Sequence, residues 1–168
     1  MSAVSLRPFL PADAARCAEI FRASVEELAS EDYGADQVEA WAARADDAGF
    51  AKRLADQLTL IALFDGAPVG FASLKGADTI DMVYVDPGIA RRGVGATLLD
   101  ALVKLAQAHG AKNLASDVSD TARPLFERLG FKAERRNLVQ LDDQWLANTT
   151  MVKRFAAPDA DAPPSTRQ

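Results

Sequence analysis

A predicted strand, a glycine-containing loop and a long helix pattern follow one another in the stretch VDPGIARRGVGATLLD (85–100). The strand ends at Asp86-Pro87, and the helix begins near Gly95. The first N–H groups of such a helix have no partner within the helix, and together with the positive end of the helix dipole they attract an anion. Glycines let the backbone approach that anion closely, and two neighbouring arginines add positive charge. The loop therefore predicts a phosphate-binding turn, although glycines at such a turn also occur for purely geometric reasons.

Two common phosphate-binding motifs do not fit this loop. A Walker A motif needs a Gly-Lys-Ser/Thr triplet, which the chain lacks. A dinucleotide-binding fingerprint needs a third glycine, and Leu98 stands at its place. The phosphate group expected here therefore belongs to another kind of ligand.

The rest of the chain consists of alternating strand and helix patterns with clear turns between them. The hydrophobic spacing predicts a mixed sheet with helices on its faces, on the border between the α/β and α+β classes. An Asp-Gly turn at 65–66 predicts a hairpin that begins an antiparallel meander of three strands. Ser119 or Asp120 is the expected N-cap of the last helix. The expected strands cover 4–9, 58–64, 69–75, 80–85, 112–118, 131–140 and 145–155, and the expected helices cover 12–29, 35–44, 46–57, 95–109 and 119–130.

The composition is that of one globular domain, with 168 residues of which 49% are hydrophobic and 26% charged. We expect that domain over residues 1–155 and a disordered tail over 156–168, which is rich in proline and alanine. The chain has no signal peptide and no run of about 18 apolar residues, so we expect a cytoplasmic protein without a membrane span. The single cysteine, Cys17, and the single histidine, His109, argue against a disulfide framework and a metal site. The net charge of −5 argues against a nucleic-acid partner.

Two segments of the chain are similar to the signature motifs of the GNAT superfamily of N-acetyltransferases. The first is Val-x-Pro at the end of the strand, followed by Arg-Gly-Val-Gly-Ala and a leucine-rich helix, and the second is ARPLFERLGF (122–131). The similarity extends over about residues 4–155, and the order of the expected elements agrees with that fold. The resemblance implies a mostly antiparallel sheet of about six to seven strands flanked by helices. It also points to a bacterial branch of single-domain acetyltransferases.

The resemblance implies an N-acetyltransferase that moves an acetyl group from acetyl-CoA to the primary amine of a small molecule. Transfer would be direct, in a ternary complex, without a metal, a nucleic acid or a membrane, and a homodimer is one assembly known among relatives. A non-catalytic acyl-CoA sensor and an enzyme acting on protein N-termini or lysines remain alternatives. The cofactor-binding residues implied are Val83, Tyr84 and Val85 of the strand, Arg91, Arg92, Gly93, Val94, Gly95, Ala96 and Thr97 of the loop, and Ser119 and Phe126 near the later motif.

At the position of the usual proton donor, this sequence departs from the pattern of the family. Relatives often protonate the leaving thiolate with a tyrosine at the place of Phe126, and carry an asparagine at the place of Ser119. Phenylalanine cannot donate a proton. Either Tyr84 replaces the missing donor, or the thiolate, with a pKa of about 8.5, leaves unaided.

A base is also needed, because an alkylammonium with a pKa of about 10 must lose a proton before it can attack. Asp81 is the expected base, since relatives often place an acidic residue on this strand. The strand period of two puts Asp81 on one face with Val83 and Val85, where partial desolvation would raise its pKa. Asp117, at the end of the next strand, is the second candidate. The structural alternative for Asp81 is a role at the end of a hairpin, bound to backbone or solvent, and the alternative for Asp117 is helix capping.

Tyr33 and Trp41 are the candidate substrate-binding residues. They lie in the segment 26–47, which holds many carboxylates and one basic residue. In relatives this segment covers the acceptor site, so aromatic rings beside carboxylates would suit a small amine. Packing of both rings against the sheet is the alternative, and Trp145 and Asn148 near the last strand carry the same two interpretations.

Overall fold

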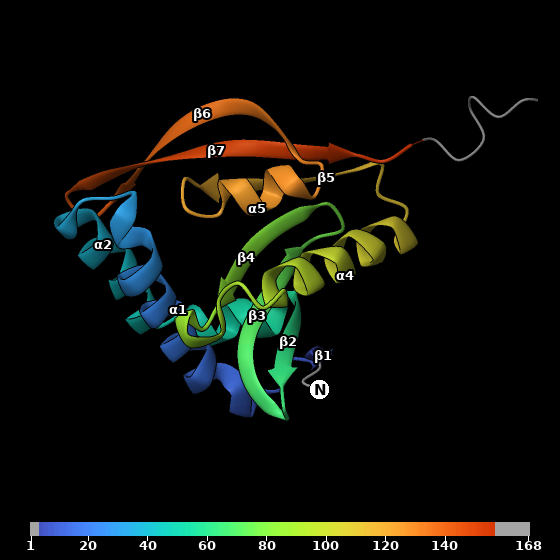
Figure 1. Cartoon of the computed structure of the whole chain (residues 1–168), viewed down its shortest axis with the longest axis horizontal. Helices are drawn as coiled ribbons and strands as arrows, with labels where there is room; N and C mark the ends of the chain where they lie inside the picture. Colours follow the sequence, from blue (N-terminus) through green and yellow to red (C-terminus); the bar gives the residue numbers. More distant parts are fainter. Residues whose placement is uncertain (1–3, 157–168) are drawn as a thin grey trace, which may run out of the picture.

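A computed structural model describes residues 4–156 of the chain. The predicted tail, 156–168, lies outside the described residues apart from Ala156. The strands are β1 (Val4–Pro8), β2 (Leu58–Phe64), β3 (Ala67–Lys75), β4 (Thr79–Val85), β5 (Asn113–Ser119), β6 (Lys132–Leu141) and β7 (Gln144–Arg154), and the helices are α1 (Ala14–Leu28), α2 (Ala35–Ala42), α3 (Phe50–Asp56), α4 (Val94–Ala108) and α5 (Arg123–Arg128) (Figure 1). Short 3-10 turns lie at Pro11–Asp13, Ala29–Glu31, Ala43–Asp46 and Pro87–Ile89.

The seven strands form one sheet in the order β1-β2-β3-β4-β5-β7-β6. All neighbouring strands are antiparallel except β4 and β5, which are parallel. The hairpin between β2 and β3 turns at Asp65 and Gly66, whose φ angles of 53° and 84° are those of the type I′ turn that an Asp-Gly pair favours. The expected mixed, mostly antiparallel sheet with an initial meander is therefore confirmed.

The parallel pair β4 and β5 stays together over a very short distance. Thr79 pairs with Ala115 and Ile80 with Ser116, after which the two strands diverge (Figure 1). On its other side β4 pairs with β3, where Leu74 pairs with Ile80 and Ser73 with Met82. Asp81 is therefore an extra residue in β4. Such a β-bulge bends its strand and disrupts the ladder. The sheet therefore opens in its middle, between the carboxyl-terminal halves of β4 and β5.

The bulge also changes which side chains share a face of β4. Met82 packs into the core under α1, whereas Val83 packs against the core under α4. Asp81, one residue before Met82, reaches α3 on the same side as Met82. The expectation that Asp81 shares a face with Val83 is therefore wrong, because one inserted residue shifts the alternation.

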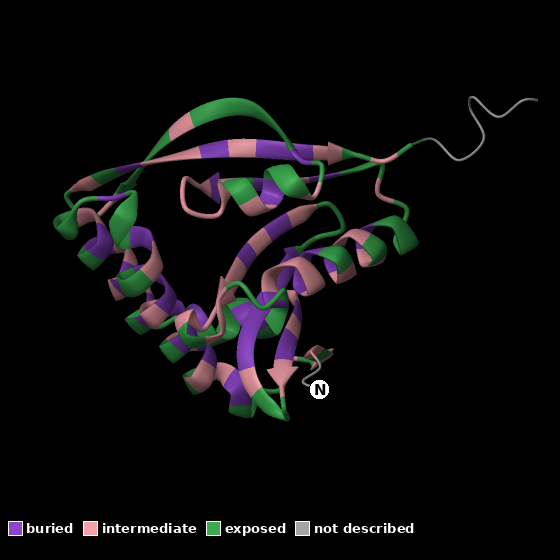
Figure 2. Cartoon of the chain, in the orientation of Figure 1, coloured by how far each residue is buried: buried purple, intermediate pink, exposed green. Residues whose placement is uncertain are grey.

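Two hydrophobic cores lie on opposite faces of the sheet, and together they position the opening (Figure 2). The apolar stripe of α1 packs with α2 and α3 on one face. The apolar stripe of α4 packs with α5 on the other, as its leucine spacing predicts. Cys17 is buried in the first core, and Phe126 is buried in the second.

Helix α5 begins later than the sequence pattern predicts. It starts at Arg123 after an N-cap at Ala122, whose side chain makes no cap hydrogen bond. Ser119 still contributes, since its Oγ accepts a hydrogen bond from the Ala122 N–H at 3.1 Å, but Asp120 instead pairs with Arg136. The expected cap at Ser119 or Asp120 is therefore wrong, because the chain makes a turn between β5 and the helix.

Phe126 packs edge-on against Phe131, with ring centroids 5.0 Å apart. Phe126→Leu removes this ring contact, and we expect it to lower the free energy of unfolding by about 1 kcal/mol. Thermal unfolding should then shift down by roughly 2–4 °C. Leu138→Ala, at a side chain that is 68% exposed, is the control and should leave the melting temperature unchanged. A melting temperature equal to that of the wild type would show that the ring pair contributes nothing.

Candidate active site

Two adjoining cavities occupy the opening between β4 and β5. The loop cavity has a volume of about 540 Å³ and is lined by the loop before α4 together with α1 and α5. The sheet cavity has a volume of about 300 Å³ and is lined by β4, β5 and β7 together with side chains from α2 and α3. The residues that line both are Trp41, Val83, Tyr84, Ser119, Ala122 and Phe126. The two cavities therefore meet where the strands diverge.

The loop cavity has the chemistry of an anion seat. Gly93 adopts φ 83°, a left-handed conformation that favours glycine, and α4 begins at the next residue. The first backbone bond into the helix runs from the Thr97 N–H to the Gly93 carbonyl, so the amides of residues 94–96 have no acceptor within the helix. A Cβ at Gly95 would lie 2.9 Å from Leu125 Cδ2. The glycine pair thus keeps this helix terminus open to a ligand.

The basic side chains around the loop do not all face the cavity. Arg91 lines it, but the Arg92 guanidinium lies over the Phe64 ring, 5.9 Å from the centroid. Thr97 is also outside the lining, and its hydroxyl donates to the Gly93 carbonyl. Arg128 of α5 does line the cavity, although sequence reasoning missed it. The sequence does carry a signal for Arg128, which is a basic residue in the last turn of the helix within the second motif.

An ion pair holds the loop against α1, the opposite wall of the loop cavity. Arg16 Nη2 lies 2.7 Å from Asp86 Oδ2, and Asp86 Oδ1 accepts a hydrogen bond from the Gly88 N–H at 2.9 Å. Burial would raise the pKa of Asp86, but the hydrogen bonds from Gly88 and Arg16 outweigh burial and keep it below its usual value. The pair joins residues 70 positions apart, so no local pattern predicts it.

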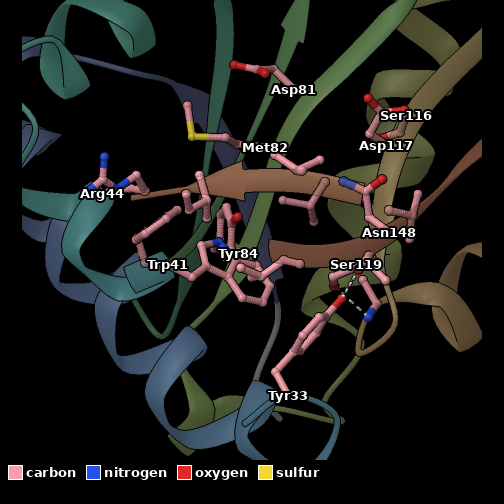
Figure 3. A pocket seen from close by; sticks show the side chains of 18 of the residues that line it. Tyr33, Trp41, Arg44, Asp81, Met82, Tyr84, Ser116, Asp117, Ser119 and Asn148 are labelled. Carbon is pink, nitrogen blue, oxygen red and sulfur yellow. Dashed lines mark hydrogen bonds between the residues drawn. The ribbon is translucent and has the colours of Figure 1, made fainter. Parts of the chain in front are cut away.

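Both predicted substrate-binding residues line the sheet cavity (Figure 3). The Tyr33 and Trp41 rings are edge-on with centroids 5.5 Å apart, and Trp41 meets Tyr84 at 6.5 Å. The Tyr33 hydroxyl donates to the Ala147 carbonyl at 2.6 Å and accepts from the Asp120 N–H at 2.9 Å. Tyr33 therefore connects the helical layer to β5 and β7, while Trp41 supplies an aromatic wall.

Tyr84 lies at the junction of the two cavities. Its ring contacts Phe21 and Phe71, with centroids 4.5 Å and 5.7 Å away. Burial raises the pKa of Tyr84 to about 12, so its hydroxyl keeps its proton at neutral pH. A protonated hydroxyl at this junction is a hydrogen-bond donor.

Asp81 is a half-buried carboxylate that lines the sheet cavity, next to Ile80, the last residue of β4 that pairs with β5. Arg53 of α3 donates to both of its oxygens, at 2.6 Å from Nε and 2.8 Å from Nη2, and Gln57 Nε2 donates at 2.8 Å. Burial would raise the pKa of Asp81, but these hydrogen bonds and the charge of Arg53 outweigh burial and hold the pKa below its usual value. The expected rise in its pKa is therefore wrong, since its partners come from a helix that the strand pattern does not reveal.

Asp117 lies across the opening from Asp81, on β5. Its exposed carboxylate accepts a hydrogen bond from the Thr150 hydroxyl at 2.6 Å. Asn148 lines the cavity opposite Ser119, whereas Trp145 is 55% exposed and lies outside the lining. Within residues 4–156, no cluster of three or more His, Cys, Asp or Glu side chains could hold a metal ion, and no helix there is long and apolar enough to span a bilayer.

Comparison with known proteins gives consistent matches. The acetyltransferase (GNAT) domain family matches residues 29–155, which include most of the lining of both cavities. The "Uncharacterized N-acetyltransferase YafP" of Escherichia coli is 34% identical over 151 residues, or 90% of this chain and 96% of YafP. A GCN5-related N-acetyltransferase from Rhodopseudomonas palustris is 56% identical with a TM-score of 0.90, over 92% of this chain and 98% of that one. YncA from Salmonella typhimurium, solved with its cofactor acetyl-CoA, is 26% identical with a TM-score of 0.62, over 94% and 99% of the two chains.

Proposed function

The chain belongs to the GNAT family of acetyltransferases, and from this premise we propose that it transfers an acetyl group from acetyl-CoA to the primary amine of a small molecule. The observation that carries the proposal is the meeting of two cavities at Val83, Tyr84 and Ser119. One cavity has the free amides of a helix start, and the other has aromatic rings, two carboxylates and two arginines. A donor and an acceptor bound in them would touch at the junction, as direct transfer in a ternary complex requires.

The loop cavity fits a coenzyme A carrier. The amides of residues 94–96 would hold its pyrophosphate, with Arg91 and Arg128 adding charge at the rim. Beyond Ile80 the β4 backbone is no longer paired with β5, so the edge at residues 83–85 is available to the pantetheine amides. The bound thioester supplies the acetyl group. YncA, which shares this fold, was solved with its cofactor acetyl-CoA, and this supports acetyl-CoA as the donor.

The sheet cavity suits an amine that arrives as a cation. Asp81 stays charged at neutral pH because Arg53 and Gln57 lower its pKa, so it attracts the ammonium and accepts its proton, directly or through water. Asp117, across the opening, is the alternative base. The ring of Trp41 offers a cation–π surface beside them.

Tyr84 is the proposed hydrogen-bond donor to the leaving thiolate, since Phe126 has no proton to give. Tyr84→Phe keeps the ring and its packing but removes the hydroxyl. We expect kcat to fall about tenfold, which is less than the roughly 100-fold minimum typical of a lost general acid, because a thiolate is a tolerable leaving group. Steady-state thiol release measures this loss. A kcat equal to that of the wild type would remove Tyr84 from the mechanism.

Release of CoA thiol from acetyl-CoA in the presence of a panel of primary amines tests the proposed function. Amine-dependent release, with a mass increase of one acetyl group on the amine, is the expected result. The rival is a non-catalytic acyl-CoA sensor, which the absence of a donor at Phe126 favours. Calorimetry separates the two, because a sensor binds acetyl-CoA but releases no thiol with any amine.

A further inference from the structure

One face of the β5-β7-β6 half of the sheet carries a chain of polar side chains beside the sheet cavity. The strand register pairs Asp117 with Thr150 and Asn137 with Asn148, and Thr150 also faces Arg135. Since partners across a ladder and residues two apart share a face, all five side chains lie on one face. Asp117 and Asn148 line the sheet cavity, as Figure 3 shows. Thr150, Asn137 and Arg135 share this face but are not part of the cavity lining.

The hydrogen bonds among these five side chains have a fixed direction, set by Arg135. A guanidinium can only donate, and Arg135 Nε donates to Asn137 Oδ1 at 2.9 Å. The amide nitrogen of Asn137 must then donate, and it does so to Asn148 Oδ1 and to Thr150 Oγ1, both at 2.9 Å. The Thr150 hydroxyl in turn donates to Asp117 Oδ1 at 2.6 Å.

This direction decides which atoms face a ligand. Asn148 uses its oxygen for Asn137, so its Nδ2 group remains as a donor. Asp117 uses Oδ1 for Thr150, so its Oδ2 remains as an acceptor. Within residues 4–156 neither Asn148 Nδ2 nor Asp117 Oδ2 has another hydrogen-bond partner. The cavity therefore presents one amide donor and one carboxylate acceptor.

We propose that Asn148 and Asp117 form the recognition pair for the acceptor, and that the acceptor carries a neutral oxygen close to its primary amine, as in a vicinal amino alcohol or an amino amide. Asp117 Oδ2 accepts from the ammonium, and Asn148 Nδ2 donates to the oxygen. The two residues are diagonal neighbours, about 7–8 Å apart with their Cβ atoms somewhat closer, so converging side chains reach groups two or three bonds apart. A carboxylate at the oxygen position is disfavoured because it would lie beside Asp117. This inference rests on the proposed function.

The test compares 2-aminoethanol with n-propylamine, which has the same number of heavy atoms but no hydroxyl, by thiol release from acetyl-CoA. We expect the ratio of their kcat/KM values to fall about fivefold in Asn148→Ala, the loss of one hydrogen bond. Taking the change in the ratio cancels the difference in basicity between the two amines. Asn137→Ala, a positioning variant, should raise KM for 2-aminoethanol more than KM for propylamine, because the Asn148 amide is then free to turn.

Leu138→Ala is the control on the same strand, since its exposed side chain points to the opposite face, and it should keep the wild-type ratio. An unchanged ratio in both Asn148→Ala and Asn137→Ala would overturn the recognition pair while leaving acetyl transfer intact. Failure of every amine to release thiol would overturn the proposed function, and this inference with it. Melting temperatures of the variants identify any loss that comes from unfolding.

Discussion

Asp81→Asn will lower kcat by about 100-fold at pH 7, the low end of the loss expected for a positioned general base. The amide has nearly the same shape, and its oxygen can still accept from Arg53 at one of the two positions, so the fold should survive the loss of the other hydrogen bond. What it lacks is the charge that attracts the ammonium and the lone pair that accepts its proton. Steady-state thiol release at saturating acetyl-CoA measures the change.

The pH dependence follows from the direction of the pKa shift. Hydrogen bonds and charge from Arg53 hold the pKa of Asp81 below its ordinary value of 3.8, so the carboxylate stays charged throughout the neutral range. The acidic limb of kcat/KM between pH 6 and 9 should therefore follow ionisation of the amine. The Asp81–Arg53 pair stabilises the fold above pH about 3.8, and this stabilisation is lost as the pH falls through the lower folded pKa.

Two further variants discriminate between the candidate bases. Arg53→Gln removes the charge that lowers the pKa of Asp81, so the carboxylate should begin to protonate at higher pH. Asp117→Asn should cost less in kcat than Asp81→Asn if Asp81 is the base. The reverse order would transfer that role to Asp117, and wild-type kinetics in Asp81→Asn would exclude Asp81.

Gly95→Val is expected to weaken CoA binding by about 30- to 150-fold, or about 2–3 kcal/mol. Even a Cβ at Gly95 would lie 2.9 Å from Leu125 Cδ2, and the two methyl groups of valine must occupy space beside that side chain. Leu125 lines the same cavity, so its displacement narrows the cavity further. The branched side chain also covers the amides that the phosphates require.

Calorimetric titration with CoA measures the affinity of this variant. Gly49→Val is the matched control, because a Cβ there meets nothing within 4 Å and Gly49 lies outside both cavities. A melting temperature close to that of the wild type, taken without ligand, establishes that the chain is folded. An unchanged affinity in Gly95→Val would place the diphosphate elsewhere.

The parts of this protein that depend on neighbours in sequence could be predicted. The Asp65-Gly66 hairpin, the loop before α4 and the leucine stripe of that helix are each specified within a few residues, because turn chemistry and helix periodicity act over that range. The same is true of the aromatic wall, since Trp41 on α2 and Tyr33 in the turn just before that helix are close together in the sequence.

The parts that depend on contacts across the chain could not. A bulge at Asp81 reverses its face, and its partner Arg53 comes 28 residues earlier, from α3. Arg16 and Asp86 likewise meet only because α1 packs beside the end of β4. A sequence pattern reveals the period of an element but not the partners that packing brings to it. Asp117 itself could be identified from the sequence, but the hydrogen bonds that orient its carboxylate extend over three strands, β5, β7 and β6.

The divergence of β4 and β5 also affects the order in which the two reactants can associate. Apart from the six shared residues, the loop cavity is lined mainly by α1, α4, α5 and the loop before α4, whereas the sheet cavity is lined mainly by β4, β5, β6 and β7, with Phe21 of α1 and Arg53 of α3. Under the proposed function, acetyl-CoA and the amine would bind in separate cavities that meet only at their shared residues. Because each cavity has most of its lining to itself, we expect either substrate to bind first and either product to leave first, and initial rates with both substrates varied would test this order.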